Sequence, residues 1–521
     1  MTEDPTLGNE FLLAVTGQMD IYSRTFIHVS CATDTTINVF APYVNMTETH
    51  HISSGTHLIS LDSRLMNEKN TLAKKGVHFT ANRPISIYVI ESYEVTMKAM
   101  EGYFALPISV LSTEYVVVTD TSVNKTMFQF VIAALENKTI VNVTFKTTGK
   151  INITDIKHSS GDVFSLEMST LDTFQVQHEN DLTGTLIQSN KPIAVFSGSR
   201  CGNGPVRGYC QHEVEQIIPD RSLGKDYITV PLFRAASYRY RIIAPFSNTI
   251  ATIEGKNYTM ERGTFLEKWD TKPIYIRASK PVMLIEYGQC TGSDCENGRD
   301  PSMITIPAIS TFSVNVTFGL HRNLTDSNIQ YYLQVTIKTD MANKLMLDHK
   351  SLNLEGSYTV QTDMWGNYTI LVVNITSGYH ELYHPDTSAR YGAILYGTGT
   401  DTSIGFPLGY HKDPSKPSVT FVLTGIQSIK LIIAIVDGRA TGYEITAAVT
   451  TGVNIYTQRG TFLTNETTTI YNFATTDLPG TCFSFRVLVT SRSGQGVGYS
   501  EPVIEPNVCY GEKVKSTLKK D

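Results

Sequence analysis

The chain has 521 residues, of which 41% are hydrophobic and 18% charged, and its formal net charge is −6. This balance excludes a disordered chain, in which charge is high and apolar content low. It also argues against a nucleic-acid binder, whose surface carries a basic surplus. At roughly 100–200 residues per domain the length predicts about three to five domains. No apolar run reaches the roughly 18 residues of a transmembrane helix.

The first residues, Met1 to Pro5, are acidic and polar. They lack the basic and apolar regions of a signal peptide. Because the cysteines and glycosylation sites described below favour secretion, we expect the chain to be a piece of a longer protein or an incomplete gene product. The alternative is a cytosolic protein.

Short runs rich in Val, Ile, Thr, Tyr and Phe, such as residues 115–118 and 333–337, alternate with Gly and Pro along the chain. Many of these runs alternate apolar with polar residues, which is the period of half-buried strands. No long stretch has the 3.6-residue period of a helix. The sequence therefore predicts an all-β protein.

A four-fold repeat organises most of the chain. In three copies a small polar residue, a basic residue and Pro precede an apolar run, and a looser fourth copy lies at 391–396. Since Pro needs no ladder partner at the first residue of a strand, each Pro is predicted to begin a strand. A second Pro follows each copy. The first set is Pro84, Pro192 and Pro281, and the second is Pro107, Pro219, Pro307 and Pro407.

The repeat length suits a small antiparallel β-sandwich or one layer of a β-stack. The predicted repeats are residues 8–120, 121–233, 234–320 and 321–411. A Pro-containing linker, 412–416, is expected to follow. The last residues, 510–521, are basic and polar and are expected to be disordered.

Six of the seven cysteines form close or plausible pairs in the sequence. Two pairs lie between the two Pro residues of a repeat, so one disulfide per connecting loop accounts for both. Metal binding would favour Cys-x-x-Cys pairs, which are absent. The predicted disulfides are Cys201–Cys210, Cys290–Cys295 and Cys482–Cys509, with Cys31 free or intermolecular.

Eleven Asn-x-Thr sites occur, roughly twice the number expected by chance, and they accept glycans only in the secretory pathway. The alternative is that Thr-rich strands produce such sites by accident. The predicted glycosylation sites are Asn45, Asn124, Asn137, Asn142, Asn152, Asn257, Asn315, Asn323, Asn367, Asn374 and Asn465.

Residues 201–231 contain Cys-x-His-x-x-Glu-Gln-x-x-Pro and then Leu-Gly-x-x-Tyr, after a strand that begins Lys-Pro-Ile. This pattern resembles the N-terminal domain of the IgGFc-binding protein family. The opening residues 8–11 and the closing stretch 391–410 are similar to that family too, although Ile404 stands where we expect Tyr. The resemblance covers about residues 8–411. It implies a secreted, multidomain mucus-type or surface protein, and membership alone does not imply Fc binding.

Residues 417–509 resemble a fibronectin type III module. Ile433 stands in place of the usual Trp of that fold, and Phe483 in place of its corner Tyr, which leaves the strand register open. Cys482, paired with Cys509, is a candidate compensation.

Three polar clusters have a structural and a functional interpretation. His212, Glu213 and Glu215 lack the second His of a zinc protease, so hydrogen bonding at a sheet edge is the favoured interpretation. His50-His51 is interpreted as a solvated pair. The acidic residues between 293 and 300 lack EF-hand spacing and are interpreted as a solvated loop.

The resulting hypothesis is a non-enzymatic secreted or cell-surface glycoprotein without a cofactor or a metal site. It would bind an extracellular protein or a mucin-type glycan in mucus, matrix or host defence. Immunoglobulin Fc ranks below these partners, because no cluster of Trp, Tyr and Arg marks a binding hot spot in the sequence. The alternatives are a glycan hydrolase, which needs two carboxylates about 5–10 Å apart, and a purely structural spacer.

Overall fold

The computed structural model describes most of the chain. The described ranges are residues 7–18, 23–93, 98–120, 127–202, 211–232, 237–288, 302–320, 329–353, 357–362, 366–399, 402–411, 418–425, 428–434, 442–450, 455–461, 468–474, 481–493, 496–499 and 503–509.

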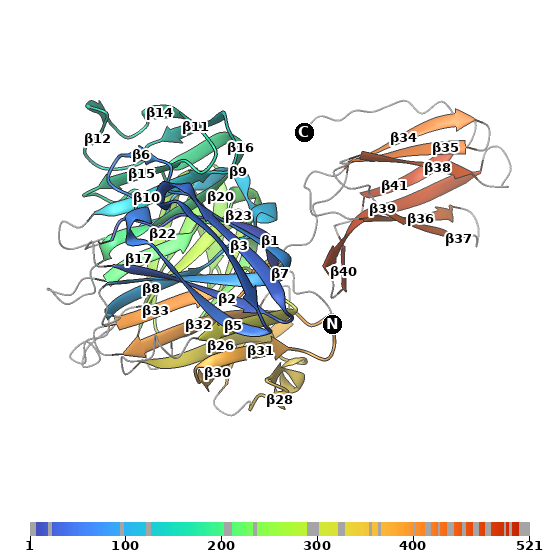
Figure 1. Ribbon diagram of the computed structural model, residues 1–521. Coiled ribbons are helices and arrows are strands. Elements are labelled where there is room, and N and C mark those ends of the chain that lie inside the picture. The colour runs from blue at the N-terminus through green and yellow to red at the C-terminus, as the bar shows by residue number, and fades with distance from the viewer. Residues whose placement is uncertain are drawn as a thin grey trace. The chain divides into compact units, whose positions relative to one another are not determined.

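The chain forms a larger unit, Asp4–His411, and a smaller unit that contains Lys412–Asp521. The described parts of both are built from strands and contain no α-helix, so the predicted all-β class is confirmed (Figure 1). No helix in these parts has the length and apolarity to cross a bilayer. The short 3-10 helices are η1 (Pro42–Val44), η2 (Ser63–Leu65), η3 (Ile108–Val110), η4 (Asp220–Ser222), η6 (Ile309–Thr311) and η8 (Ala342–Lys344).

Each of the first three repeats consists of two antiparallel sheets that share one long strand. In the third repeat the first half of β23 pairs with β18 and β20, and its second half pairs with β19 and β24. The strands are β18 (Gly224–Thr229), β19 (Tyr238–Ala244), β20 (Thr249–Ile253), β21 (Lys256–Met260), β22 (Thr264–Asp270), β23 (Ile274–Gly288) and β24 (Ser302–Thr305).

The first two repeats have the same plan, with β7 and β16 as their long strands. The first has β1 (Gly8–Leu13), β2 (Arg24–Cys31), β3 (Thr35–Ala41), β4 (Met46–Ile52), β5 (Gly55–Leu61), β7 (Val77–Tyr93) and β8 (Lys98–Phe104). The second has β9 (Ser112–Val116), β10 (Phe128–Ala134), β11 (Thr139–Thr144), β14 (Val163–Met168), β15 (Thr173–His178), β16 (Leu186–Gly202) and β17 (Gln211–Gln216). It also has a hairpin, β12 (Ile151–Ile153) with β13 (Ile156–His158), and it pairs β15 with β6 (Leu72–Ala73).

The fourth repeat departs from this plan because its long strand is divided into β31 and β32. One sheet has the order β25-β31-β27-β28 and the other β29-β30-β26-β32-β33. The strands are β25 (Asn315–Leu320), β26 (Gln330–Lys338), β27 (Met346–Leu347), β28 (Lys350–Ser351), β29 (Tyr358–Thr362), β30 (Gly366–Ile375), β31 (Gly378–Tyr383), β32 (Tyr391–Gly399) and β33 (Thr402–Pro407).

The prediction that the first set of Pro residues begins strands is wrong. Each lies inside a long strand, where the chain bulges and passes from one sheet to the other. In β16, pairing with β9 skips from Gln188 to Ile193 around Pro192. Strands that change sheets do so at such bends, and a bulge leaves room for a residue that donates no hydrogen bond.

The polar residues before each Pro serve the bulge. Asn190 Oδ1 accepts the backbone N–H of Ile140 at 2.8 Å, and Lys191 donates to the carbonyl of Asn137 at 2.8 Å. The same bonds recur in the third repeat, from Ser279 and Lys280, and Asn82 repeats the first of them in the first repeat. The sequence motif therefore satisfies backbone groups that the bulge leaves without ladder partners.

The predicted repeat limits at 121, 234 and 321 lie too late. Strands β9, β18 and β25 precede these limits but pair within the following repeat. The chain passes to the next repeat soon after the second set of Pro residues: Pro107 and Pro219 are the N-caps of η3 and η4. A Pro in extended backbone ends the preceding strand and cannot continue its ladder.

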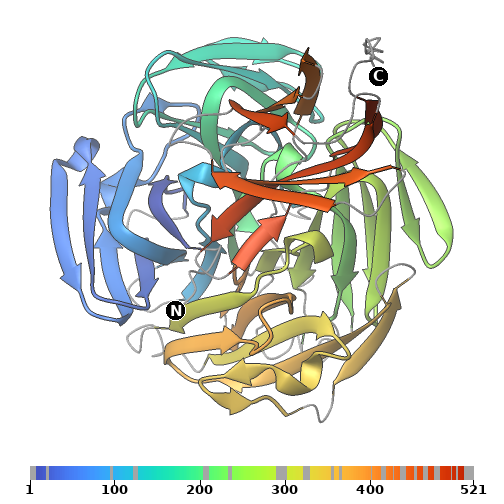
Figure 2. The ribbon, with the colours of Figure 1, turned by 90° about the vertical axis from the view of Figure 1, so that its right-hand side faces the viewer.

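The innermost strands of the four repeats form a closed ring. β8 lies beside β17 and β33, and β24 also lies beside β17 and β33. Figure 2 shows the repeats around this centre, in blue, teal, green and yellow to orange. The arrangement is that of blades in a β-propeller, except that each repeat here has two sheets.

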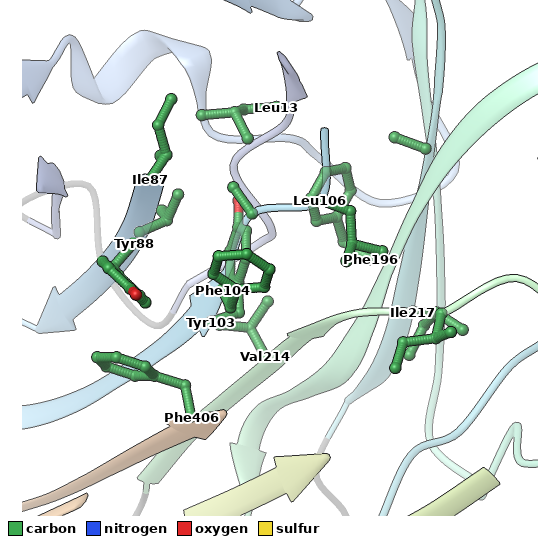
Figure 3. Packing of buried hydrophobic residues seen from close by; sticks show 14 of the residues in the cluster. Leu13, Ile87, Tyr88, Tyr103, Phe104, Leu106, Phe196, Val214, Ile217 and Phe406 are labelled. Atoms are coloured by element: carbon green, nitrogen blue, oxygen red, sulfur yellow. The ribbon is translucent and has the colours of Figure 1, made fainter. Parts of the chain in front are cut away.

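Aromatic side chains pack where the repeats meet (Figure 3). Tyr88 of β7 packs against Phe104 of β8 and Phe406 of β33, with ring centres 5.6 and 5.3 Å away. Tyr103 of β8 packs against Phe196 of β16 at 5.4 Å. Such pairs contribute roughly 0.5–1.5 kcal/mol beyond the burial of their area, so they help to hold the first repeat to the second and the fourth.

The smaller unit is a separate β-sandwich. A sheet β34-β35-β38 packs against a sheet β37-β36-β39-β40, in which β41 also pairs with β39. Phe483 and Phe485 of β39 lie in the shared core with Phe473 of β38, so Phe483 serves as a core residue. The strands are β34 (Ser418–Gly425), β35 (Ser428–Ala434), β36 (Gly442–Val449), β37 (Ile455–Thr461), β38 (Thr468–Ala474), β39 (Cys482–Ser493), β40 (Gly496–Tyr499) and β41 (Val503–Cys509).

Gly184 and Gly263 meet where the second repeat contacts the third. A Cβ on Gly184, whose φ is +94°, would overlap the carbonyl oxygen of Gly263. We expect Gly184→Ala to destabilise the larger unit by about 1–3 kcal/mol more than Gly161→Ala, because overpacking adds to the cost of a positive φ. Gly161 is the matched control, with φ +92° and open space around it. Denaturant unfolding measures both, and equal losses would contradict the contact.

Candidate functional site

The block His212 to Gln216 lies in β17, one of the four innermost strands. Glu215 Oε1 accepts the backbone N–H of Thr305 at 2.7 Å, and Gln216 Oε1 accepts that of Leu106 at 2.8 Å. These bonds tie the second repeat to the third and the first. These two bonds, at the centre of the ring, support a structural role for Glu215 and Gln216.

Glu101 of β8 has a similar place. Its Oε1 accepts the N–H groups of Gly102 and Gly405 at 3.0 Å, and its Oε2 accepts that of Met303 at 3.1 Å. One carboxyl group thereby joins β8, β24 and β33. Burial raises the pKa of Glu101 well above its ordinary value, although these N–H groups lower it.

His212 lies in a buried cluster that has the residue types of a catalytic triad. Its Nε2 lies 2.8 Å from Glu91 Oε2 and 3.1 Å from Thr16 Oγ1. A triad needs the acid and the nucleophile on opposite ring nitrogens. Here both contact the same nitrogen, so the ring has no path along which to relay a proton.

A glycan hydrolase, one alternative interpretation of the sequence, needs acids that line an open cleft. Glu215 lines a cavity of only about 10 Å³ at the end of the ring, which is room for about one water molecule. A glycosidase places two carboxyl groups about 5–10 Å apart with a sugar between them. This cavity is too small for that purpose.

The remaining candidate residues do not converge. His50 pairs with Glu48 at 2.9 Å and His51 contacts Thr36 at 3.0 Å, and both histidines lie on β4. The described residues hold no cluster of three metal-ligating side chains. The predicted acidic loop, between 293 and 300, lies outside the described residues.

The structure describes only some of the cysteines for which disulfides were predicted. Cys31 is a free, buried thiol in β2, and burial raises its pKa. Cys482 of β39 and Cys509 of β41 lie directly opposite each other in the ladder, and their disulfide stays a prediction. Cys210, Cys290 and Cys295, with the side chain of Cys201, lie outside the described residues.

Most of the predicted glycosylation sites are exposed. Asn315 is half-buried, and Asn124, Asn323 and Asn465 lie outside the described residues. Exposure is required for a glycan, although it does not show that one is attached. The exposed sites are Asn45, Asn137, Asn142, Asn152, Asn257, Asn367 and Asn374.

Two buried arginines of β19 lie where the third repeat meets the second. Arg239 pairs with Asp120 and donates to Glu267 at 3.1 Å. Arg241 donates to the same Oε2 of Glu267 at 2.8 Å and to Asp181 at 3.0 Å. A buried charge is tolerated only when it is paired and hydrogen-bonded, so this network fixes the position of Glu267.

Glu267 separates two exposed aromatic residues on β22, an edge strand. Phe265 and Trp269 are 37% and 52% exposed, and the three side chains share one face because they alternate along the strand. The guanidinium of Arg241 lies 4.3 Å from the centre of the Phe265 ring. We name Phe265, Glu267 and Trp269 the β22 stripe.

The two arginines lie between acidic groups, with Glu267 on one side and Asp120 on the other. Burial opposes ionisation of Glu267, but hydrogen bonds and charges from Arg241 and Arg239 lower its pKa. On the other side of Arg239, burial and then the Asp120 carboxylate raise the pKa of Glu213 well above its ordinary value. Asp120, which pairs with Arg239, is therefore the nearby charge that opposes ionisation of Glu213.

Sequence reasoning missed the β22 stripe. The sequence feature that could have indicated it lies in the neighbouring strand β19. There, residues 238–241 read Tyr-Arg-Tyr-Arg, so that two charged residues alternate with aromatic ones. That pattern ordinarily indicates a half-exposed strand, yet every residue of β19 is buried. Two of the acids that pair with the arginines, Asp120 and Asp181, come from distant parts of the chain.

Glu286 of β23 supports a pH-dependence prediction. It is buried and accepts a hydrogen bond from the Thr229 hydroxyl at 2.6 Å, and burial raises its pKa from 4.5 to about 8. The folded chain therefore holds one more proton than the unfolded chain between these pH values. The stability from this group is complete below pH 4.5 and is lost toward pH 8, at about 1.4 kcal/mol per pH unit.

We expect Glu286→Gln, which cannot ionise but keeps an acceptor for Thr229, to lose less thermal stability than the parent chain between pH 5 and pH 8. Scanning calorimetry at both pH values measures the change. Glu261→Gln, on the surface of the same repeat, is the control and should follow the parent. Parallel profiles for the parent and Glu286→Gln would contradict the assignment.

Two comparisons with solved structures gave weak likenesses. The FN1-FN3 domains of chicken CNTN1 share 12% identity at a TM-score of 0.15, covering 55% of this chain and 99% of that chain. A β-glucuronidase of Ruminococcus gnavus shares 9% identity at a TM-score of 0.15, covering 55% and 36%. At these scores neither likeness bears on fold or function.

Comparison with curated proteins gives a match to the human IgGFc-binding protein, with 26% identity over 214 residues. The match covers 40% of this chain and 4% of that much longer relative. The family model described as IgGFc binding protein matches residues 101–397, from β8 to β32. That range is more than half of the chain and includes the inner strands β8, β17 and β24, so the chain belongs to the IgGFc-binding protein family.

Proposed function

We propose that the chain is a non-enzymatic extracellular module that binds another protein through the β22 stripe. The observation that carries this proposal is a pair of exposed aromatic residues beside a buried arginine network. The Arg241 guanidinium contacts the Phe265 ring, and Trp269 lies opposite Arg239 in the ladder. Trp, Tyr and Arg are the residues that most often dominate binding energy in interfaces. Side chains fixed before binding lose less conformational entropy when the complex forms.

The stripe also suits a protein partner because β22 is an edge strand. Its outer edge has backbone groups without a ladder partner in the sheet, and an extended segment of another protein can pair with such an edge. Glu267 would supply charge at the centre of the contact. The partner segment we propose therefore has a basic residue between apolar ones.

The extracellular location is supported by the family and by the exposure of most described glycosylation sites. Mucus, matrix or host defence remain the proposed settings. An extracellular protein is the proposed partner. A mucin-type glycan and immunoglobulin Fc, which the family name mentions, are alternatives that the binding experiment separates.

The non-enzymatic assignment rests on how the buried acids are used. Glu101 and Glu215 accept backbone N–H groups, and Asp120 pairs with Arg239. An acid catalyst must reach its substrate, whereas these groups lie inside the fold. For the smaller unit, we propose a fibronectin type III-like module.

The binding test uses the secreted, glycosylated chain against immobilised Fc, purified mucin and a panel of extracellular proteins. Trp269→Ala should weaken the protein interaction at least tenfold, because truncating a central Trp costs roughly 2 kcal/mol or more. Phe40→Ala is the matched control: Phe40 is 43% exposed but lies on β3 of the first repeat, and the variant should bind as the parent does.

Two results would count against this proposal. One is equal affinity of the Trp269→Ala and parent chains for every partner found, which would move the site elsewhere. The other is the absence of binding across the whole panel, which would favour the structural spacer.

If the chain is secreted, a disulfide is expected in the smaller unit. Non-reducing peptide mapping of the secreted chain should recover the peptides of Cys482 and Cys509 joined, because their backbones face each other in the ladder. Removing this bond by Cys509→Ser should destabilise the unit by about 2–4 kcal/mol. Recovery of both cysteines as free thiols would argue against an oxidising compartment.

A further inference from the structure

The fourth repeat differs from the others at one place. In the first three repeats the long strand crosses between its sheets through a short bulge at Pro84, Pro192 or Pro281. In the fourth, residues 384–390 separate β31 from β32 and replace that bulge. In a repeat protein, an element that only one copy has is not required by the common plan.

The segment 384–390 is held in one conformation by its own polar groups. Asp386 Oδ1 accepts the N–H of Ser388 at 2.9 Å and its hydroxyl at 2.7 Å. His384 Nδ1 accepts the N–H of Asp386 at 3.0 Å, and His384 Nε2 lies 3.1 Å from the carbonyl oxygen of Met341. Ser388, Ala389 and Arg390 of this segment form one wall of a pocket.

This wall encloses a pocket of about 260 Å³. Its floor is apolar and includes Ile309, Met341 and the edge-to-face pair of Phe312 and Tyr368, whose ring centres are 6.2 Å apart at 80°. Burial and two nearby aspartates raise the pKa of Tyr368 to about 12, so its hydroxyl is neutral at physiological pH. Pockets for drug-sized ligands begin near 300 Å³, so this one suits a ligand about the size of one amino-acid residue.

The charged groups that line the pocket are both cations, Lys338 and Arg390. Lys338 is exposed at the end of β26, where it faces Tyr368 across the ladder. Ser388 adds a hydroxyl to the lining. The two aspartates near Tyr368, Asp226 and Asp340, are not among the residues that line the pocket. The charges that a ligand would contact are therefore the two cations, which favour a ligand with a negative charge and an apolar body.

We propose that this pocket binds a small carboxylate with an apolar body, in the size range of a single aromatic or aliphatic amino acid. The carboxylate would contact Lys338 and Arg390, and the body would lie against Phe312 and Tyr368. Two sources share this chemistry: a free carboxylic acid and the C-terminal residue of a peptide. The site is separate from the β22 stripe and does not depend on the function proposed for it.

The test titrates the full chain with N-acetyl-L-phenylalanine and with its uncharged amide by calorimetry. We expect a Kd on the order of 0.1–1 mM for the acid, from the usual efficiency of small ligands, and at least tenfold weaker binding of the amide. Lys338→Met should weaken the acid about three- to tenfold. Lys344→Met is the matched control, since Lys344 is exposed on the adjacent η8 and does not line the pocket.

The peptide Gly-Gly-Phe, with a free or an amidated C-terminus, separates the two sources. Tighter binding of the free-terminus peptide than of the N-acetyl amino acid would identify a peptide terminus as the ligand, and equal or weaker binding would identify a free acid. The proposal is overturned if the acid does not bind at 10 mM, if its amide binds equally well, or if Lys344→Met weakens binding as much as Lys338→Met. Trp269→Ala should leave this binding unchanged.

Discussion

The edges of four strands at the centre of the ring determine the larger unit. β8, β17, β24 and β33 each pair with one strand of their own repeat, so one edge of each faces the centre. Buried peptide groups on such an edge must find partners. Glu101, Glu215 and Gln216 supply acceptors to four peptide N–H groups of other repeats and to the one next to Glu101 itself. These bonds join the first repeat to the other three and the second repeat to the third. The buried acids that first resemble catalytic groups serve this purpose.

The sequence predicted the strands, their four-fold order and the family, because alternation and Pro motifs depend on neighbouring residues. It failed where partners are distant in the chain. Asn190 and Lys191 were expected just before the start of a strand, and their role at a bulge is evident only once β11 lies beside β16. Arg239 and Arg241 likewise depend on Asp120 and Asp181, which no local pattern connects to them. The repeat pattern in the sequence also does not show that the four copies close into a ring.

The two candidate binding sites lie where one repeat departs from the shared plan. The third repeat has arginines inside a buried strand, with aromatic residues exposed beside them. The fourth replaces a bulge with a hydrogen-bonded segment that lines a pocket. The contacts of Asn or Ser at the bulges recur in the first three repeats because each of these long strands needs them where it changes sheets. Differences among copies are free of that requirement, and they are therefore the better guide to binding.

Closure of the ring also sets an order of events during synthesis. Gly405 donates to Glu101, a residue 304 positions earlier in the chain, so the first repeat receives its last neighbour only when the fourth has been made. A solenoid, in which each repeat contacts only the adjacent ones, has no such delay. Until then the inner edge of β8 is open to solvent, and open edges pair readily with other chains. The nascent chain therefore has an unprotected strand from the time β8 is made until β33 is made, which makes chaperone access to the first repeat a constraint on expression.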